Sequence, residues 1–525
     1  MRASRLLVDC LRAEGVDRAF GIPGEENVDL MDDLHSGGME FVLTRHEQAA
    51  AFMAATVGRL TGRPGVCVST LGPGATNLAT GVADAHLSHL PLVALVAQAG
   101  AARRDPPQKQ VLDLLALFRP ITKRAMDVGG PGDVPASVRR AFALAARERP
   151  GPVMLQVPED VMGMEASGEP IGPPKVKARR APAARLEEVR ALLRTAERPL
   201  VLAGHGVLRE EACEELRAFC EAWGIPVGCT WMAAGALPYD HPLSLGTVGM
   251  RDSDLVRASY EEADAVLLVG FDCPEFQPQY WDRGSRKRIA YLGRAPPMRC
   301  PDLGLEIVAV GDLVHSLGAL TRGAERKDAW HAVHREDLLR EVNREGESPR
   351  AVVKALRRQM GRADIVVSDV GAHLIWLAKY YPAYGPNTLL LQNGLISMGV
   401  AMPSAIAAKL VHPERRVVAA VGDGGFLMAS AELETARRLG VRFVTVVFND
   451  GGLGLIREKM QRRLGRSSNV DLGLPDIPTY ARSFGAEGYS VGEREFEEVL
   501  RDCLARDALA IIDVKVDYSY NRSLF

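Results

Sequence analysis

The stretch AAVGDGGFLMASAELETARRLGVRFVTVVFND, residues 419–450, decides the fold because it places polar residues directly after two apolar runs. The first run leads into Gly-Asp-Gly-Gly around Asp423, and the second ends in Asn449. A helix is predicted between them, with acidic residues early, basic residues late and Gly440 as its stop. In a right-handed βαβ unit both strands end at the same edge of the sheet. We therefore expect Asp423 and Asn449, 26 residues apart in sequence, to be neighbours in space.

A carboxylate oxygen and an amide oxygen set among glycines suit Mg²⁺ better than zinc. Mg²⁺ takes a few hard oxygen ligands and completes its octahedron with water and phosphate. The backbone N–H groups of Gly424 and Gly425 open a helix, which is a ready site for an anion. The pattern therefore predicts Mg²⁺ that bridges the protein to a diphosphate. The structural alternative is a tight glycine turn followed by an unrelated Asn-Asp loop. A Walker phosphate loop is excluded and a dinucleotide fingerprint is disfavoured, because neither motif occurs here.

The composition is that of an ordinary globular protein. The chain has 525 residues, of which 47% are hydrophobic and 25% charged, so about three domains are expected. Its 64 Lys and Arg nearly balance its 66 Asp and Glu, which gives no global reason to expect nucleic acid or an anionic membrane as a partner. Apolar runs such as 90–100 are too short to span a bilayer, and residues 1–16 are typical of an amphipathic helix rather than a signal peptide. Eight scattered cysteines without a C-x-x-C pair indicate reduced thiols in a cytoplasm, mostly packed as small apolar groups.

Short β-branched runs alternate with helical patterns along the whole chain. A linker rich in proline and basic residues is predicted at 166–188, and a charged, partly helical one at 321–350. We expect an α/β fold with three doubly wound parallel-sheet domains, at 1–165, 185–325 and 345–525. The predicted strands are 65–70, 91–97 and 152–158 in the first domain, 199–204 and 264–270 in the second, and 364–369, 416–424, 442–450 and 510–516 in the third.

The sequence GDGGFLMASAELETA, followed by FND, resembles the metal and diphosphate motif of thiamine diphosphate enzymes. The rest of the chain is similar to the acetolactate synthase branch of that superfamily over nearly its full length. The matching segments, in order, are 20–34, 42–54, 69–85, 121–125, 151–161 and 395–408. The resemblance implies thiamine diphosphate and Mg²⁺ as cofactors, and it makes the three domains a pyrimidine-binding, a central and a diphosphate-binding domain.

The resemblance also assigns candidate binding residues. It implies that Asp423 and Asn449 ligate Mg²⁺ through their side chains and Gly451 through its carbonyl. Met398 would bend the cofactor, and the carbonyl of Ile396 would accept from its 4′-amine. Further cofactor contacts are implied for Gly72, Pro73, Gly74, Asn77, Gly371, His373, Gly424 and Gly425. The structural alternatives are a solvent-facing helix start for His373 and a simple core position for Met398.

Glu47 lies in the sequence His-Glu-Gln, after an apolar run and before a helix of small residues. The resemblance implies that Glu47 bonds N1′ of the aminopyrimidine, so that the 4′-nitrogen can remove the C2 proton of the thiazolium ring. The structural alternative is an acid favoured at a helix start by the helix dipole. The family places this glutamate in one subunit and the metal site in another, which implies a homodimer or a homotetramer with active sites at the subunit interface.

The activity implied is decarboxylation of a 2-keto acid, pyruvate, followed by carboligation to a second 2-keto acid. Gln110 stands where the family has a glutamine that lines the active site. Lys109 departs from the usual His or Phe, so it either binds an acidic acceptor or faces solvent. A 2-keto acid decarboxylase that releases an aldehyde, and a carboligase with another acidic acceptor, stay open as alternatives.

Residues 269–281, VGFDCPEFQPQYW, resemble the flavin-free catabolic synthases, so FAD is expected to be absent. A nicotinamide dehydrogenase would need a dinucleotide fingerprint that the chain lacks. A paralogue without catalysis is disfavoured because Glu47, Asp423 and Asn449 are all retained.

Overall fold

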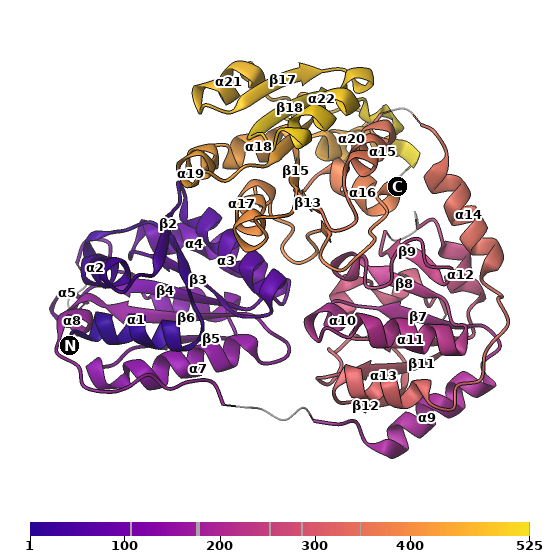
Figure 1. Cartoon of the computed structure of the whole chain (residues 1–525), viewed down its shortest axis with the longest axis horizontal. Coiled ribbons are helices and arrows are strands. Elements are labelled where there is room, and N and C mark those ends of the chain that lie inside the picture. The colour runs from indigo at the N-terminus through magenta and orange to yellow at the C-terminus, as the bar shows by residue number, and fades with distance from the viewer. Residues whose placement is uncertain (105–107, 175–178, 251–253, 285–286, 347, 524–525) are drawn as a thin grey trace.

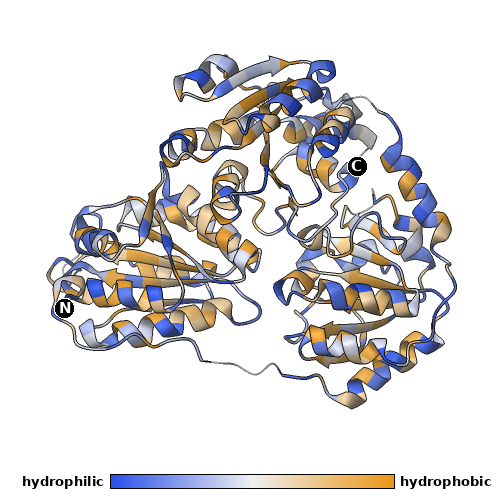
Figure 2. Cartoon of the chain, in the orientation of Figure 1, coloured by the Kyte–Doolittle hydropathy of each residue, from blue (hydrophilic) through white to orange (hydrophobic). Residues whose placement is uncertain are grey.

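The computed structural model describes all residues except 105–107, 175–178, 251–253, 285–286, 347 and 524–525 (Figure 1). It contains three α/β domains, each built around a six-stranded sheet in which all the paired strands are parallel. Helices flank these sheets, which confirms the predicted fold class. Figure 2 shows why the strands are buried: they are largely hydrophobic, whereas many helices carry one polar and one apolar side. The boundaries 1–165, 185–325 and 345–525 stay predictions.

The N-terminal domain has the strand order β2-β1-β3-β4-β6-β5. The amphipathic helix predicted at its start is α1, which buries Leu6, Leu7 and Leu11. The three strands predicted in this domain are confirmed as β3, β4 and β6. Its strands are β1 (Arg18–Gly21), β2 (Glu40–Leu43), β3 (Gly65–Ser69), β4 (Leu92–Gln98), β5 (Arg124–Asp127) and β6 (Pro152–Pro158), and its helices are α1 (Ala3–Ala13), α2 (Val28–Ser36), α3 (Glu47–Thr61), α4 (Pro73–Leu87), α5 (Ala101–Arg104), α6 (Leu114–Phe118), α7 (Val134–Ala146) and α8 (Glu159–Gly163).

The central domain has the strand order β12-β11-β10-β7-β8-β9. Strands β7 and β10 lie side by side and parallel in the middle, and the later strands are added outward from them in opposite directions. Helix α9 begins inside the expected linker 166–188, which is therefore shorter than predicted, and α14 supplies the helical part of 321–350. The strands are β7 (Pro199–Ala203), β8 (Val227–Thr230), β9 (Ser244–Val248), β10 (Ala265–Val269), β11 (Arg288–Gly293) and β12 (Leu305–Val310), and the helices are α9 (Ala183–Thr195), α10 (Gly206–Arg209), α11 (Cys213–Trp223), α12 (Arg257–Glu262), α13 (Leu313–Thr321) and α14 (Ala332–Asn343).

The C-terminal domain has the order β14-β13-β15-β16-β18-β17. The single helix predicted after β15 is in fact two, α18 and α19, because the bonds from Leu433 to Ser430 and from Glu434 to Ala431 tighten the chain between them. Gly440 ends α19 in the left-handed conformation, as predicted. The strands are β13 (Ile365–Ser368), β14 (Leu389–Leu390), β15 (Val417–Gly422), β16 (Val444–Asn449), β17 (Glu487–Val491) and β18 (Ala510–Lys515), and the helices are α15 (Arg350–Gln359), α16 (Ala372–Tyr380), α17 (Ala401–Val411), α18 (Asp423–Ala429), α19 (Glu432–Leu439), α20 (Gly454–Leu464), α21 (Ile477–Ser483) and α22 (Glu493–Ala505).

The N-terminal and C-terminal domains of one chain share a hydrophobic cluster. Helix α3 packs against α17, side by side in Figure 1, and apolar residues of both domains belong to this cluster. Inside it, the Thr56 hydroxyl donates to Ser404 Oγ at 2.8 Å, so the buried polar groups are satisfied across the interface. The two domains are therefore held together as one packed unit. Among the helices that the structure describes, none combines the length and the apolarity needed to cross a membrane.

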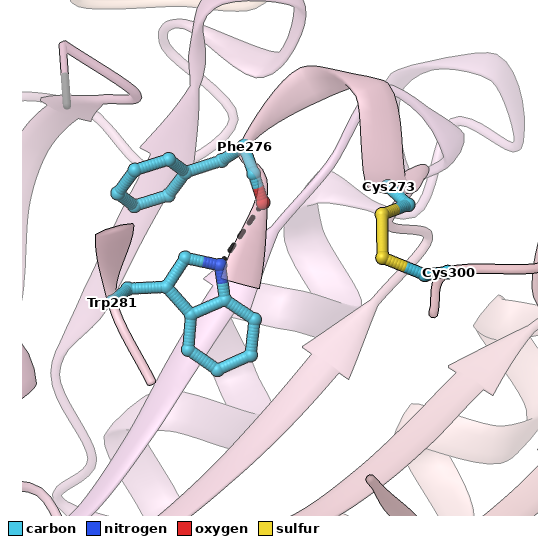
Figure 3. The surroundings of a disulfide bond; sticks show 4 residues. All are labelled: Cys273, Phe276, Trp281 and Cys300. Atoms are coloured by element: carbon cyan, nitrogen blue, oxygen red, sulfur yellow. Dashed lines mark hydrogen bonds between the residues drawn. A yellow bond between two sulfur atoms is a disulfide. The ribbon is translucent and has the colours of Figure 1, made fainter. Parts of the chain in front are cut away.

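The expectation that the cysteines are reduced thiols is wrong for one pair. Cys273 and Cys300 form a disulfide in the central domain (Figure 3). The sequence pattern missed it because the two residues lie 27 positions apart and follow the adjacent parallel strands β10 and β11, which bring their loops together only in the fold. The other six cysteines are free, and five of them are buried, in line with packing as small apolar groups.

We predict that Cys273→Ser lowers the midpoint of thermal unfolding. The disulfide closes a loop and so limits the conformations of the unfolded chain, which raises the free energy of unfolding by about 3 kcal/mol, and the substitution removes this contribution. Non-reducing digestion of the wild type followed by mass spectrometry should yield one peptide pair joined through Cys273 and Cys300. Cys213→Ser, at a free cysteine, is the control and should leave that pair intact. Recovery of both cysteines with free thiols under non-reducing conditions would contradict the pairing.

Candidate active site

The carboxyl ends of β15 and β16 lie side by side, with Gly422 opposite Phe448 in the parallel register. Asp423, the first residue of α18, and Asn449, the last residue of β16, therefore meet at one edge of the sheet. Asp423 is only 2% exposed and Asn449 only 3%, so the polar groups of both side chains need hydrogen-bond partners.

The oxygens of Asp423 and Asn449 converge on the loop that follows β16. Asp423 Oδ2 accepts from the Gly452 N–H at 2.8 Å, and Asn449 Oδ1 accepts from the Gly451 N–H at 3.1 Å. Asp423 Oδ1 accepts from the Gly424 N–H at 2.8 Å, and burial raises the pKa of Asp423 against these hydrogen bonds. The side-chain oxygens of Asp423 and Asn449 are hard ligands, which is the kind of ligand that Mg²⁺ requires. The residues present therefore fit the metal.

The third expected ligand is the carbonyl of Gly451. Its residue adopts the left-handed conformation (φ 73°), and its carbonyl accepts from the Leu472 N–H at 3.0 Å. Arg457 Nη2 also donates to this carbonyl, at 3.4 Å, so both lone pairs of the oxygen are engaged, and a bound cation would replace the longer of the two contacts. Within the residues described, no group of three or more His, Cys, Asp or Glu side chains could hold a metal ion. A cation at Asp423 and Asn449 would thus depend on carbonyl, amide and phosphate oxygens.

Asp513 orients the Asn449 amide, and the sequence analysis did not identify it. Asn449 Nδ2 donates to Asp513 Oδ1 at 2.7 Å, which turns the amide oxygen toward the Gly451 loop. Asp513 also accepts from Ser490 Oγ at 2.9 Å and pairs with Lys515 at 3.2 Å. The available signal was a carboxylate in the middle of the apolar strand β18.

Asp369 is a second residue that the sequence analysis did not identify, although it lies in the run SDVGAH, residues 368–373, with Gly371 and His373. It follows β13 and is fully buried, and its carboxylate accepts from the Gly399 N–H at 2.9 and 3.0 Å and from the Ala401 N–H at 3.3 Å. Burial raises the pKa of Asp369 to about 6. These bonds fix the start of α17 and the preceding loop, which carries Ile396 in the left-handed conformation (φ 57°).

The same geometry brings Met398 to the helix start that was predicted to bind phosphate. A Cβ atom on Gly424 would lie 3.1 Å from Met398 Cε, and one on Gly425 would lie 2.9 Å from Asp369 Oδ1. Neither glycine could therefore carry a side chain without displacing these groups. Met398, Gly424, Gly425 and Asp369 form one wall beside the Asp423 edge.

His373 is buried, so the solvent-facing alternative for it is wrong. Its ring stacks on Phe448 with centroids 5.5 Å apart, and burial lowers its pKa to about 4, which keeps the imidazole neutral. It lies beside Gly371, where a Cβ would meet the ring at 2.9 Å. Its Nε2 atom has no hydrogen-bond partner among the residues described. An orphaned polar atom at this edge fits a site that is completed by a ligand.

Glu47 begins α3 in the N-terminal domain and is 7% exposed. Asn77 Nδ2 donates to Glu47 Oε2 at 3.0 Å, and a Cβ on Gly74 would lie 3.3 Å from Glu47 Oε1. The loop predicted to face the pyrimidine therefore faces Glu47. It turns at Gly72, which has a φ of 56°, and Pro73 opens α4 at a position where proline is favoured.

Gln110 lies against this loop, close to Gly72. A Cβ on Gly72 would lie 3.0 Å from Gln110 Cβ, so the two backbones approach closely. Gln110 is exposed and left-handed (φ 69°), and Lys109 is exposed. The structure thus gathers Glu47, Asn77 and Gln110 around the Gly72 loop. In the described part of the chain, no hydrogen bond or ion pair links this group to Asp423 or Asn449.

Comparison with protein families now gives the class. Residues 1–117 match the family model described as thiamine pyrophosphate enzyme, N-terminal TPP binding domain, residues 186–296 match its central domain, and residues 369–514 match its C-terminal TPP binding domain. The three domains, with the two groups of site residues on the outer pair, define a thiamine pyrophosphate-dependent enzyme.

The relatives narrow this class. The acetolactate synthase of Bacillus subtilis (strain 168) is 36% identical over 548 residues, covering 100% of this chain and 94% of the relative. The catabolic acetolactate synthase of Raoultella terrigena is 31% identical, with coverage of 98% and 95%. The large subunit of acetolactate synthase isozyme 2 from Escherichia coli (strain K12) is 31% identical, with coverage of 98% and 96%. This chain belongs to the acetolactate synthase branch of the thiamine pyrophosphate enzymes.

We predict that Asp513→Ala weakens Mg²⁺ binding about 10–100-fold, the range for partners that orient a metal ligand. The Asn449 amide would lose the acceptor that turns its oxygen toward the loop. Thermal shift in a Mg²⁺ titration at saturating thiamine diphosphate measures the change. Asp513→Asn, which keeps an acceptor, should lose less, and Asp502→Asn on the exposed face of α22 should lose nothing. An unchanged affinity in Asp513→Ala would show that Asn449 needs no such partner.

Proposed function

We propose that the chain catalyses the thiamine diphosphate- and Mg²⁺-dependent decarboxylation of a 2-keto acid, pyruvate, and its carboligation to a second 2-keto acid. The observation that carries the proposal is the coexistence of two half-sites, a buried one around Asp423 and Asn449 and a partly buried one around Glu47 and Asn77. The names of the relatives support the same activity. A location in the cytoplasm is part of the proposal.

The C-terminal half-site would hold the diphosphate end of the cofactor. Asp423, Asn449 and the Gly451 carbonyl would bind Mg²⁺, and the N–H groups of Gly424 and Gly425 would face the phosphates at the start of α18. Gly371 and the orphaned Nε2 of His373 would add contacts there. Met398 and the Ile396 carbonyl would contact the rings.

The N-terminal half-site would start the chemistry. When bound, thiamine diphosphate supplies a ring that takes up the electron pair released by decarboxylation. Glu47 would share a proton with N1′ of the pyrimidine, as a general acid held in place by Asn77. Gly72, Pro73 and Gly74 would let the backbone approach the pyrimidine closely, and Gln110 would line the substrate side.

The two half-sites imply a second copy of the chain. Leu395, Ile396, Leu427 and Met428 are exposed apolar residues next to Met398, and a Cβ on Gly399 would lie 3.3 Å from Met428 Cβ. An apolar surface at the mouth of a site is suited to burial against a partner. We infer a homodimer or homotetramer in which the N-terminal domain of one copy covers the C-terminal half-site of another.

Lys109 carries the proposal on specificity. Its ammonium is exposed beside Gln110, where it would bind the carboxylate of the acceptor through a charge-assisted hydrogen bond. An acceptor with an additional acidic group would use the same cation, which keeps a carboligase of other specificity as the second candidate.

We also propose that the enzyme works without FAD. In open α/β sheets a nucleotide binds where the strand order reverses, here outside the carboxyl ends of β7 and β10. In this chain Glu275 occupies the donors at that edge: its carboxylate accepts from the His205 N–H at 3.1 Å and from the Thr230 hydroxyl. These donors would otherwise be available to a phosphate.

Incubation with pyruvate, thiamine diphosphate and Mg²⁺ should yield acetolactate, identified by mass spectrometry. Removal of Mg²⁺ with a chelator should stop the reaction and remove the thermal stabilisation by the cofactor. Asp423→Ala should behave like the wild type without Mg²⁺. Acetaldehyde as the main product would favour a simple decarboxylase instead.

Glu47→Gln tests the N-terminal half-site, as Asp423→Ala tests the C-terminal one. It should bind the cofactor but slow hydrogen–deuterium exchange at C2, followed by NMR, by about 10²–10⁴-fold. Glu40→Gln, at the exposed first position of β2, is the control and should exchange at the normal rate. Normal exchange in Glu47→Gln would return Glu47 to a structural role.

Protein purified without added FAD should be colourless and active, and added FAD should leave its rate unchanged. The absorbance between 350 and 500 nm, roughly the flavin range, measures bound cofactor. A yellow preparation with one FAD per chain would overturn the reading of residues 269–281.

A further inference from the structure

Glu432 lies outside both half-sites, yet it touches the segment that carries Glu47. It is the first residue of α19 in the C-terminal domain, and it is 2% exposed. Its Oε1 accepts from the backbone N–H groups of Arg45 at 2.8 Å and His46 at 3.1 Å, in the N-terminal domain of the same chain. Its Oε2 accepts from Thr435 Oγ1 at 2.6 Å.

The two N–H groups that Glu432 binds fix the start of α3. His46 is the N-cap of that helix, and its ring accepts from the Gln48 N–H at 3.1 Å. Glu47 follows as the first helical residue, so the position of its Cα is set by the residues that Glu432 holds. Removing the carboxylate would take the shared acceptor away from both N–H groups and so release the segment that begins α3.

A simpler reading is that Glu432 is an acid favoured at a helix start by the dipole. That reading does not explain the contacts, because Oε1 bonds the other domain rather than the free N–H groups of α19. Neighbouring residues of α19 reach the same segment: Glu434 pairs with Arg45 at 3.3 Å, and Arg438 donates to the Leu43 carbonyl. The segment before Glu47 is thus docked on α19.

A second buried carboxylate, this time on the N-terminal domain, lies close to backbone N–H groups of the C-terminal domain. Asp84 of α4 is buried, and the backbone N–H groups of Leu395 and Ser397, on either side of Ile396, oppose the rise in its pKa that burial causes, while its Oδ1 has no hydrogen-bond partner among the residues described. With the α3–α17 packing, these contacts make the C-terminal domain of the same chain the fixed support against which Glu47 is placed.

We propose that Glu432 is a positioning residue for Glu47 and that it acts within one chain. This inference rests on the proposed function, in which Glu47 of one chain works opposite Asp423 of another. The consequence is that each Glu47 is held by a C-terminal domain other than the one that binds the diphosphate opposite it.

Substitutions at Glu432 distinguish the effect of side-chain length from the effect of its negative charge. Glu432→Ala removes the acceptor and should slow C2 hydrogen–deuterium exchange and kcat about 10–100-fold, with the half-saturating concentrations of thiamine diphosphate and Mg²⁺ changed less than about threefold. Glu432→Gln keeps an oxygen at the same reach and should restore most of the rate. Glu432→Asp keeps the charge but is one methylene shorter, so it should resemble Glu432→Ala. Glu498→Ala, at an acid of α22 whose side chain is 80% exposed, is the control and should exchange like the wild type.

Mixed dimers test whether the effect stays within one chain. Combining a Glu47→Gln chain with an Asp423→Ala chain leaves one intact site, built from Glu47 of the second chain and Asp423 of the first. Glu432→Asp added to the second chain should slow that site, and the same substitution added to the first chain should not.

The outcomes distinguish this inference from the proposed function. If the wild type shows no C2 exchange, the proposed function fails. If the wild type exchanges but Glu432→Asp and Glu432→Gln behave alike, or if the slow mixed dimer is the one altered in the first chain, Glu432 does not position Glu47. Should Glu432→Ala not fold, the comparison of Asp with Gln and the mixed dimers still decide the question.

Discussion

The parallel pairing of β15 with β16 is the constraint on which the candidate site depends. Because the two strands run in the same direction and in register, the residues that follow them meet at one edge of the sheet. The helices between them return the chain across the sheet, so Asp423 and Asn449 arrive at that edge without any direct contact in sequence. Asp513, from the next strand of the sheet, then turns the amide oxygen of Asn449 toward the Gly451 loop.

A single sheet edge supplies only half of what the chemistry needs. The acid Glu47 lies on a different sheet, and its surroundings come from the Gly72 loop and Asn77. The link between these sheets within one chain is the packing of α3 on α17, together with the buried Glu432 carboxylate, which binds backbone N–H groups across the interface. This carboxylate is satisfied only when both domains are in place, which joins the geometry of the site to the packing of the domains.

The buried acids around the site follow one physical pattern. Asp369, Glu432 and Asp513 accept hydrogen bonds from backbone or side-chain donors, and each one fixes a neighbouring element. Burial of a carboxylate is costly unless its oxygens have such donors. Their burial therefore requires precise backbone placement, and it gives the loops that carry Met398, Glu47 and Asn449 a defined position.

The sequence by itself determined the three α/β domains, the strands of the three sheets that it predicted and the proximity of Asp423 to Asn449, because strand period, glycine turns and the handedness of βαβ units act over short distances. The resemblance to thiamine diphosphate enzymes also pointed to Glu47 and to the class of cofactor. Only the tertiary structure decided the roles of Asp369, Asp513 and Glu432, the burial of His373 and the Cys273–Cys300 pair. These depend on contacts between segments that meet only when separate strands and domains pack, and no local pattern in the chain records which donor a buried acid will find.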